Sequence, residues 1–191
     1  MRFSKITLVM LVVSMTILNA SAGLRIVAYG DSGVYGKGVA RNEAYPAQLE
    51  AMLRQKGYDV TVINDGINGL TSTDAVAYVG SVGKADVVIV HVGINDVHQG
   101  VRPGTIQRNV AWIIDKLKAN GARVLVVSNP LADVCDVALA KRTPCVKWGG
   151  HVPETQYVVP GDPQQHLNAA GLHLLALKIL PVLEKLLVAK H

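Results

Sequence analysis

The sequence predicts a single α/β domain whose mostly parallel central sheet, of four to five strands, is covered by helices on both faces. Half of the 191 residues are hydrophobic, and this length suits one sizeable core rather than two. Four apolar, β-branched runs have the composition of buried strands: 24–29, 60–63, 86–92 and 123–127. Three intervening segments carry apolar residues at helical spacing: 45–56, 72–82 and 105–120. Because strand and helix alternate along the chain, the strands are expected to be parallel.

The last third of the chain departs from this alternation. After Asn129-Pro130 the sequence is rich in Pro and Gly and holds both cysteines, so an irregular stretch is expected before a final helix over 168–190. Pro181 should kink that helix, because proline removes a main-chain donor and clashes with the preceding turn. We expect the short irregular stretch, 129–162, to form one wall of the site described below.

The N-terminus has the organisation of a secretory signal peptide. Arg2 and Lys5 precede an apolar run at 6–18, and the small residues Ala20-Ser21-Ala22 follow it. The run is shorter than the roughly 20 apolar residues that span a bilayer, and no cysteine stands at the cleavage site for lipid attachment. We therefore expect a signal peptide at 1–22 and a secreted or periplasmic protein without a stable membrane anchor.

The expected mature domain, residues 23–191, carries a mild positive charge. Loss of Arg2 and Lys5 lowers the formal charge from +5 to +3. The remaining cations are scattered, and no stripe of Arg and Lys is interleaved with aromatic residues, so no nucleic-acid partner is expected.

The two cysteines, Cys135 and Cys145, are expected to form a disulfide. Export places them in an oxidising compartment, and an even count with one short intervening loop favours a bridge. The alternative is a pair of small unpaired hydrophobic residues. A metal site is not expected, because the thiols lack histidine partners at ligand spacing.

Chemically unusual loops follow the predicted strands. They are Gly-Asp-Ser-Gly at 30–33, Asn-Asp-Gly-Ile-Asn-Gly at 64–69 and Gly-Ile-Asn-Asp at 93–96. In open α/β sheets, ligands bind beyond the carboxyl ends of the strands, so all three loops should open on one edge. A fourth segment, 161–168, places a histidine directly before the last helix, where it can reach the same edge. Together the four segments offer a serine nucleophile, amide donors and a base.

This order of motifs resembles the SGNH, or GDSL-type, hydrolase family. The resemblance implies a three-layer, flavodoxin-like α/β/α fold and hydrolysis of small-molecule carboxylic esters without a metal or organic cofactor. It also implies that Ser32 is the nucleophile and His166 the general base. The oxyanion donors would be the backbone N–H groups of Ser32 and Gly69 and the side-chain amide of Asn95.

The chemistry explains these residue types. A serine hydroxyl is a weak nucleophile until a base takes its proton, and an imidazole with a pKa near 6.5 can do so close to neutral pH. Fixed donors stabilise the oxyanion by about 3 to 4 kcal/mol each. An amide donates without a competing charge, which favours Asn95 over Asp96 in this role.

The third member of the triad departs from the family pattern. The family uses Asp-x-x-His, but Pro163 stands three residues before His166, and Asp162 stands four before it. We favour Asp162 as the acid that orients the imidazole through a loop one residue longer. The alternative is a Ser-His dyad in which a backbone carbonyl orients the ring.

Other polar residues near these loops are given structural roles. Asp31 and Asp96 are interpreted as loop organisers that accept backbone N–H bonds. His91 lies in an apolar strand and is interpreted as a hydrogen-bonded core residue, whereas His98 is expected to border the pocket and His173 to be structural. Because no Asp or Cys lies at matching spacing, these histidines do not indicate a zinc site.

Other α/β classes fit less well. The segment 30–38 fails the phosphate-loop pattern, since Asp31 and Gly38 stand where Gly and Ser or Thr are needed. The Gly-x-Ser-x-Gly elbow of the other large α/β hydrolase class is absent. A non-catalytic exported binding domain on the same fold is the competing hypothesis, and Pro163 is its only support. The acyl and alcohol preferences stay open among short esters, thioesters, lysophospholipids and acetylated sugars.

Overall fold

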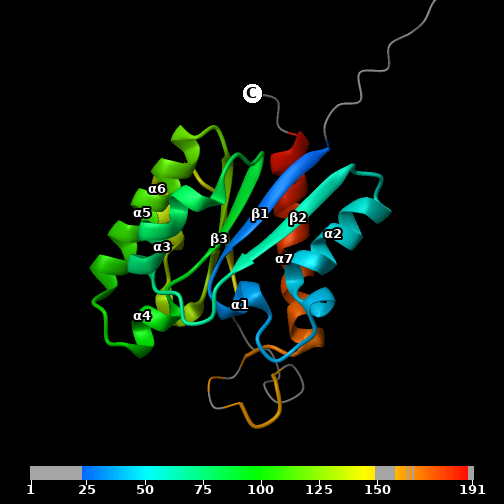
Figure 1. The fold of residues 1–191 in the computed structure, drawn as a ribbon. Coiled ribbons are helices and arrows are strands. Elements are labelled where there is room, and N and C mark those ends of the chain that lie inside the picture. Colours follow the sequence, from blue (N-terminus) through cyan, green and yellow to red (C-terminus); the bar gives the residue numbers. More distant parts are fainter. Residues whose placement is uncertain (1–22, 149–157, 163, 165, 189–191) are drawn as a thin grey trace, which may run out of the picture.

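Five parallel strands form the central sheet in the order β2-β1-β3-β4-β5 (Figure 1). The structure, a computed structural model, describes residues 23–148, 158–162, 164 and 166–188. The strands are β1 (Leu24–Gly30), β2 (Val60–Gly66), β3 (Val87–His91), β4 (Arg123–Ser128) and β5 (Cys145–Lys147). The helices are α1 (Ser32–Tyr35), α2 (Tyr45–Gln55), α3 (Ser72–Tyr78), α4 (Ile94–His98), α5 (Pro103–Ala119), α6 (Cys135–Ala140) and α7 (Ala169–Val188). Three short 3-10 helices complete the described elements: η1 (Arg41–Glu43), η2 (Val79–Val82) and η3 (Pro130–Ala132).

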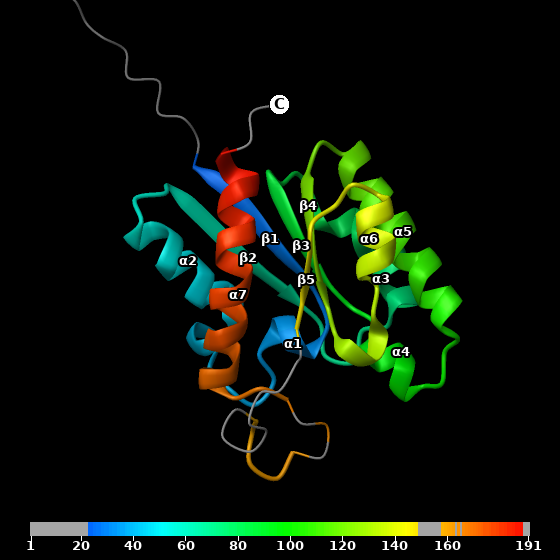
Figure 2. The same ribbon diagram turned by 180° about the vertical axis from the view of Figure 1, so that it is seen from behind.

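Helices cover both faces of this sheet, which confirms the predicted three-layer fold. The helices α2 and α7 lie on one face, and α3, α5 and α6 lie on the other (Figures 1 and 2). In β1, Ile26 and Ala28 join the core on the α2 and α7 side, whereas Val27 and Tyr29 join the opposite core. Because all four are at most 1% exposed, β1 needs a continuous apolar run rather than an alternating one.

The strand order places a crevice at one end of the sheet. The strand β1 pairs with β2 on one side and with β3 on the other, so the chain changes direction across the sheet between β1 and β3. Ligands of flavodoxin-like sheets bind at this switch point, beyond the carboxyl ends of the strands. Ser32 begins α1 directly after β1, and Asn95 lies in α4 after β3. The topology therefore brings both residues to the same edge.

The stretch that was expected to be irregular contains a helix and a strand, so this part of the prediction is wrong. The helix α6 packs beside α5, and β5 adds a fifth parallel strand in which Cys145 pairs with Val126. Six-residue and three-residue elements are too short to produce a periodic sequence signal. A disulfide between Cys135 and Cys145, with Cα atoms 5.4 Å apart, joins α6 to β5 and confirms the predicted bridge. Residues 149–157, also part of the expected wall, lie outside the described residues.

The last helix begins and continues much as predicted. The Asn168 side chain accepts a hydrogen bond from the Gly171 N–H (3.0 Å), as an N-cap does. The helix α7 continues past Pro181 to Val188, and the expected kink stays a prediction. None of the described helices is long and apolar enough to cross a membrane. The expected signal peptide, 1–22, lies outside the described residues.

Candidate active site

Ser32 lies where β1 turns into the short helix α1. Asp31 caps this helix, because its Oδ1 accepts a hydrogen bond from the Gly33 N–H (2.9 Å), and its own N–H donates to the carbonyl of His91 (3.1 Å). A Cβ atom at Gly30 would lie 2.0 Å from the His91 carbonyl oxygen, so only glycine fits there. The Gly-Asp-Ser sequence therefore lets β1 approach β3 closely and fixes the serine at the start of a helix.

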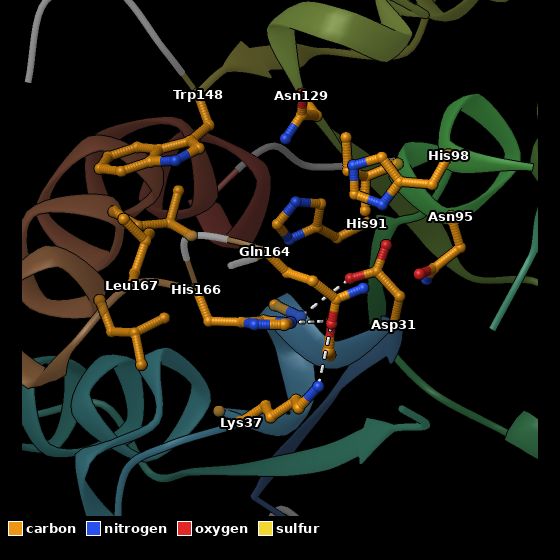
Figure 3. Close-up of a pocket in the computed structure, with 16 residues that line it drawn as sticks. Asp31, Lys37, His91, Asn95, His98, Asn129, Trp148, Gln164, His166 and Leu167 are labelled. Atoms are coloured by element: carbon orange, nitrogen blue, oxygen red, sulfur yellow. Dashed lines mark hydrogen bonds between the residues drawn. The ribbon is translucent and has the colours of Figure 1, made fainter. Parts of the chain in front are cut away.

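His166 reaches Ser32 from a loop near the other end of the chain. Its Nε2 lies 2.8 Å from Ser32 Oγ (Figure 3). The two sides of the loop pair with each other: Val158 forms an antiparallel bridge with Leu167, and the Val159 N–H donates to the His166 carbonyl (2.8 Å). This pairing holds the imidazole over the carboxyl edge of the sheet.

Asp162 contacts the other nitrogen of the same imidazole. Its Oδ2 is hydrogen-bonded to Nδ1 of His166 and also accepts the His166 backbone N–H (2.8 Å), while Oδ1 accepts the Gln164 N–H (3.1 Å). These hydrogen bonds, the one from the His166 backbone first, lower the pKa of Asp162 to about 2, so the carboxylate is ionised at neutral pH. The loop folds around the carboxylate, and so an acid four residues before the histidine still reaches the ring.

Asn95 and Asp96 connect two of the loops at this edge. Asn95 is 8% exposed, and its side-chain amide donates one hydrogen bond to the Leu70 carbonyl (2.9 Å), which leaves its second N–H free to donate. Asp96 is fully buried and accepts hydrogen bonds from the backbone N–H (2.7 Å) and hydroxyl (2.6 Å) of Ser72. The predicted role of Asp96 as a loop organiser is confirmed, and so is the same role for Asp31.

Gly69 lies in a turn beside the site and not in the lining of the pocket. It has a φ of +81°, which favours glycine, and it occupies the turn before Leu70. It is not among the residues that line the pocket, although the hydrogen bond between Leu70 and Asn95 ties its turn to the site. Its proposed role as an oxyanion donor stays a prediction.

A pocket at this edge brings together three of the predicted site residues: Ser32, Asn95 and His166. Its other side chains include an apolar group from the α7 side and a polar group at the opening: Trp148, Leu167, Leu172, Leu175, Lys37, His98, Asn129 and Gln164 (Figure 3). The expected position of His98 at the pocket is thus confirmed. Lys37, Trp148 and Gln164 were not predicted to line the site, because none of them belongs to a recurring motif.

Three buried side-chain atoms of the described residues have no hydrogen-bond partner. In the described part of the chain these are Oδ2 of Asp31, Nδ1 of His91 and the hydroxyl of Tyr45. His91 was interpreted as a hydrogen-bonded core residue: it is 6% exposed and its carbonyl accepts the Asp31 N–H (3.1 Å), although Nδ1 of its ring has no partner. Burial raises the pKa of Asp31 to about 7 and lowers the pKa of His91 to about 4.

His173 of α7 contacts Gln48 of α2 through its Nδ1 (2.7 Å), so it links two helices away from the pocket. Within the described ranges, no three side chains of His, Cys, Asp or Glu are grouped so that they could hold a metal ion.

A parallel α/β sheet with a serine, an imidazole and a carboxylate in hydrogen-bonded series at its carboxyl edge defines the class of SGNH-type serine hydrolases. The chain belongs to the GDSL-like Lipase/Acylhydrolase family, whose sequence pattern matches residues 28–170.

Two similar sequences and one similar structure extend this result. The chain is 31% identical over 110 residues to Esterase TesA of Pseudomonas aeruginosa, an alignment that covers 56% of this chain and 55% of TesA. It is 31% identical over 111 residues to an arylesterase of Vibrio mimicus, covering 56% of each. The chain thus spans about half the length of these relatives. A crystal structure of TesA superposes with a TM-score of 0.73 and 26% identity over 85% of this chain and 99% of that chain.

Proposed function

We propose that the protein is an exported serine esterase that hydrolyses carboxylic esters through an acyl-enzyme on Ser32. The observation that carries this proposal is the hydrogen bond of 2.8 Å between Ser32 Oγ and His166 Nε2. A base at this distance can remove the hydroxyl proton as the oxygen attacks. The contact between Asp162 and Nδ1 of the ring supports a full triad and argues against the non-catalytic binding domain that Pro163 favoured.

The geometry supports a two-step reaction. In the first step Ser32 Oγ bonds to the ester carbonyl carbon while His166 Nε2 takes its proton, and the resulting oxyanion is stabilised by fixed N–H donors. The C–O bond to the alcohol then breaks, and His166 returns the proton to the leaving oxygen. In the second step His166 takes a proton from water, whose oxygen attacks the acyl carbon, and the acid is released from Ser32.

Two residues complete the proposed oxyanion hole beside the Ser32 N–H. The free amide N–H of Asn95 is supported by its position in the pocket and by the hydrogen bond that fixes its side chain. The backbone N–H of Gly69 is proposed from the family resemblance. The names of the two relatives, an esterase and an arylesterase, favour acyl esters as the substrate class.

Export is part of the same proposal. The charged and apolar segments at the N-terminus support it, and so does the disulfide between Cys135 and Cys145, since such bonds persist in oxidising compartments. When the full chain is expressed in a bacterial host, mass spectrometry should find a mature protein beginning at Gly23 outside the cytoplasm. Uncleaved protein that stays in the cytoplasm would contradict this part.

Hydrolysis of a p-nitrophenyl ester tests the enzymatic proposal. Ser32→Ala should lower kcat at least about 1,000-fold, because the variant has no nucleophile and keeps only binding and oxyanion stabilisation. Ser81→Ala is the matched control, since Ser81 is exposed and its hydroxyl donates to the Tyr78 carbonyl. Equal hydrolysis by the Ser32→Ala variant and the parent would exclude Ser32 as the nucleophile.

A further inference from the structure

A lysine ammonium that has no carboxylate partner among the described residues lines the pocket. The Lys37 ammonium lines the pocket and donates a hydrogen bond to the side-chain carbonyl of Gln164 (3.0 Å; Figure 3). In the part of the chain that the structure describes, Lys56, Lys141 and Lys147 form ion pairs with carboxylates, whereas the contact of Lys37 is to a neutral amide. The hydrogen bond therefore fixes the ammonium without neutralising it.

Both partners of this hydrogen bond are tied to the catalytic groups. The Lys37 backbone N–H donates to the carbonyl of Ser32 (3.2 Å), so Lys37 is anchored to the helix that begins with the nucleophile. The Gln164 backbone N–H donates to Asp162, the carboxylate that also contacts His166 (3.1 Å). The ammonium is thus anchored to both sides of the Ser32–His166 pair.

Few carboxylates among the described residues line the pocket beside this ammonium. Among the described residues that line the pocket, Asp31 is the one carboxylate, and it is 1% exposed and caps α1. Because burial raises the pKa of Asp31 to about 7, its carboxyl group is partly neutral near neutral pH. The imidazoles of His91 and His98 also line the pocket and add no negative charge. The ionised carboxylate of Asp162 lies behind Gln164 and is bonded to His166 and to the Gln164 N–H, so the charge that lines the pocket beside Gln164 is the Lys37 ammonium.

The position of Lys37 indicates which part of an ester it meets. His166 gives its proton to the leaving oxygen, so the alcohol part of the substrate lies on the side of the imidazole. Gln164, which holds the Lys37 ammonium, belongs to the same loop as His166, whereas Asn95 lies on the other side of Asp31 from His166 in the view of Figure 3. The cation therefore stands on the alcohol side of the scissile bond.

We propose that Lys37, held by Gln164, selects esters whose alcohol part carries an anionic group such as a carboxylate or a phosphate. This inference rests on the proposed esterase function and names its substrate class. An ammonium on a flexible stem acts on such a group as a point charge. Lys37 should therefore raise kcat/KM for an anionic ester relative to a neutral ester that is otherwise alike.

The test compares matched aryl acetates. Purified parent protein is assayed with 4-acetoxybenzoate, with its neutral methyl ester and with 4-acetoxyphenyl phosphate, and kcat/KM for each anion is divided by that for the neutral ester. Lys37→Gln should lower this ratio about threefold to fivefold, the scale of an exposed ion pair, and Lys37→Arg should retain it. Because intrinsic reactivity is the same for every variant, the change in the ratio reports recognition alone.

Two controls isolate the local charge. Lys84→Gln makes the same charge change at an exposed residue just before β3, at the opposite edge of the sheet, and should leave the ratio unchanged. Added salt should lower the ratio for the parent and not for Lys37→Gln, since screening acts on the charge that the variant lacks. Gln164→Leu should give an intermediate ratio, because the ammonium loses the group that holds it.

The outcomes separate this inference from the function on which it rests. Hydrolysis of all the esters with the same ratio in the parent and Lys37→Gln would overturn the role of Lys37 and leave the esterase intact. A charge preference that appears only with phenyl hemisuccinate, whose anion is on the acyl side, would overturn the placement. Absence of hydrolysis of every ester by the parent would overturn the proposed function and this inference with it.

Discussion

Ser32 Oγ and His166 Nε2 lie 2.8 Å apart, although 134 positions separate the two residues in the chain. The sheet topology explains the meeting: β1 delivers Ser32 to the carboxyl edge, and the paired loop before α7 delivers His166 to the same edge. Asp162 then contacts the far side of the imidazole. The proposed reaction depends on this series of three side chains.

The carboxylate of Asp162 is the first target for a variant. Asp162→Asn should lower kcat about 100-fold to 10,000-fold, because an amide cannot stabilise the imidazolium and favours the wrong tautomer of the ring. Steady-state hydrolysis of a p-nitrophenyl ester measures this loss, and thermal unfolding monitors the loop. Asp136→Asn, at an acidic residue in the first turn of α6, serves as the control. Parental turnover by Asp162→Asn would instead indicate a Ser-His dyad.

The side-chain amide of Asn95 is expected to act on the transition state. Asn95→Ala should reduce kcat about 100-fold to 1,000-fold with little change in KM, the result of removing one oxyanion donor. The same variant loses the hydrogen bond to the Leu70 carbonyl, so a moderate drop in Tm should accompany it. A variant that lowers Tm and keeps the parental kcat would assign Asn95 to structure alone.

The buried pair of Asp31 and His91 should give stability two opposing dependences on pH. The folded-state pKa of Asp31, about 7, lies above the ordinary value of 3.8, so its contribution to the unfolding free energy falls as pH rises from about 4 to 7. The folded-state pKa of His91, about 4, lies below the ordinary value of 6.5, so its contribution rises over pH 4 to 6.5. The two contributions largely cancel in the parent.

Single variants should separate these contributions. Relative to the parent, Asp31→Asn should gain unfolding free energy by about 1 kcal/mol per pH unit between pH 4.5 and 6.5, and His91→Gln should lose a similar amount. Denaturant unfolding at several pH values measures both slopes. The double variant should run parallel to the parent in this window. If both single variants also run parallel to the parent, the two groups do not titrate as their burial implies.

The disulfide should stabilise the wall that carries Trp148. Replacing Cys135 and Cys145 together by Ala should lower the unfolding free energy by about 2 to 3 kcal/mol, because a loop of this length constrains the unfolded chain by that order. Reduced parent protein should show the same loss. Since β5 leads directly into Trp148 at the pocket, KM should rise more than kcat falls. Unchanged stability after reduction would contradict the stabilising role of the bridge.

The regular part of the fold was predictable because its sequence signal is strong. All four predicted strands are present, and β2 continues to Gly66 past the predicted end at Ile63, since polar residues such as Asn64 pair with the end of β1. A sequence cannot distinguish such a polar strand end from a turn. The short elements α6 and β5 were missed because a disulfide and one neighbouring strand stabilise them rather than a long apolar pattern.

The site was predictable where it follows motifs and not elsewhere. Ser32, Asn95 and His166 meet at one pocket as expected, because each directly follows a strand or precedes a helix at the same edge. The contact between Asp162 and His166 depends on the backbone N–H groups that the loop turns toward the carboxylate. The four-residue spacing of the two residues in the sequence did not specify this loop conformation. Lys37 came to the pocket through the turn that follows α1.

Covalent labelling is the most direct test that Ser32 is the nucleophile. A serine-directed fluorophosphonate is incubated with the parent protein, and peptide mass spectrometry locates the adduct without any assumption about the natural substrate. We expect a single phosphonylated residue, Ser32, with labelling abolished in Ser32→Ala and greatly slowed in His166→Ala, which lacks the base. A parent protein that remains unlabelled, or an adduct that persists in Ser32→Ala, would contradict this expectation.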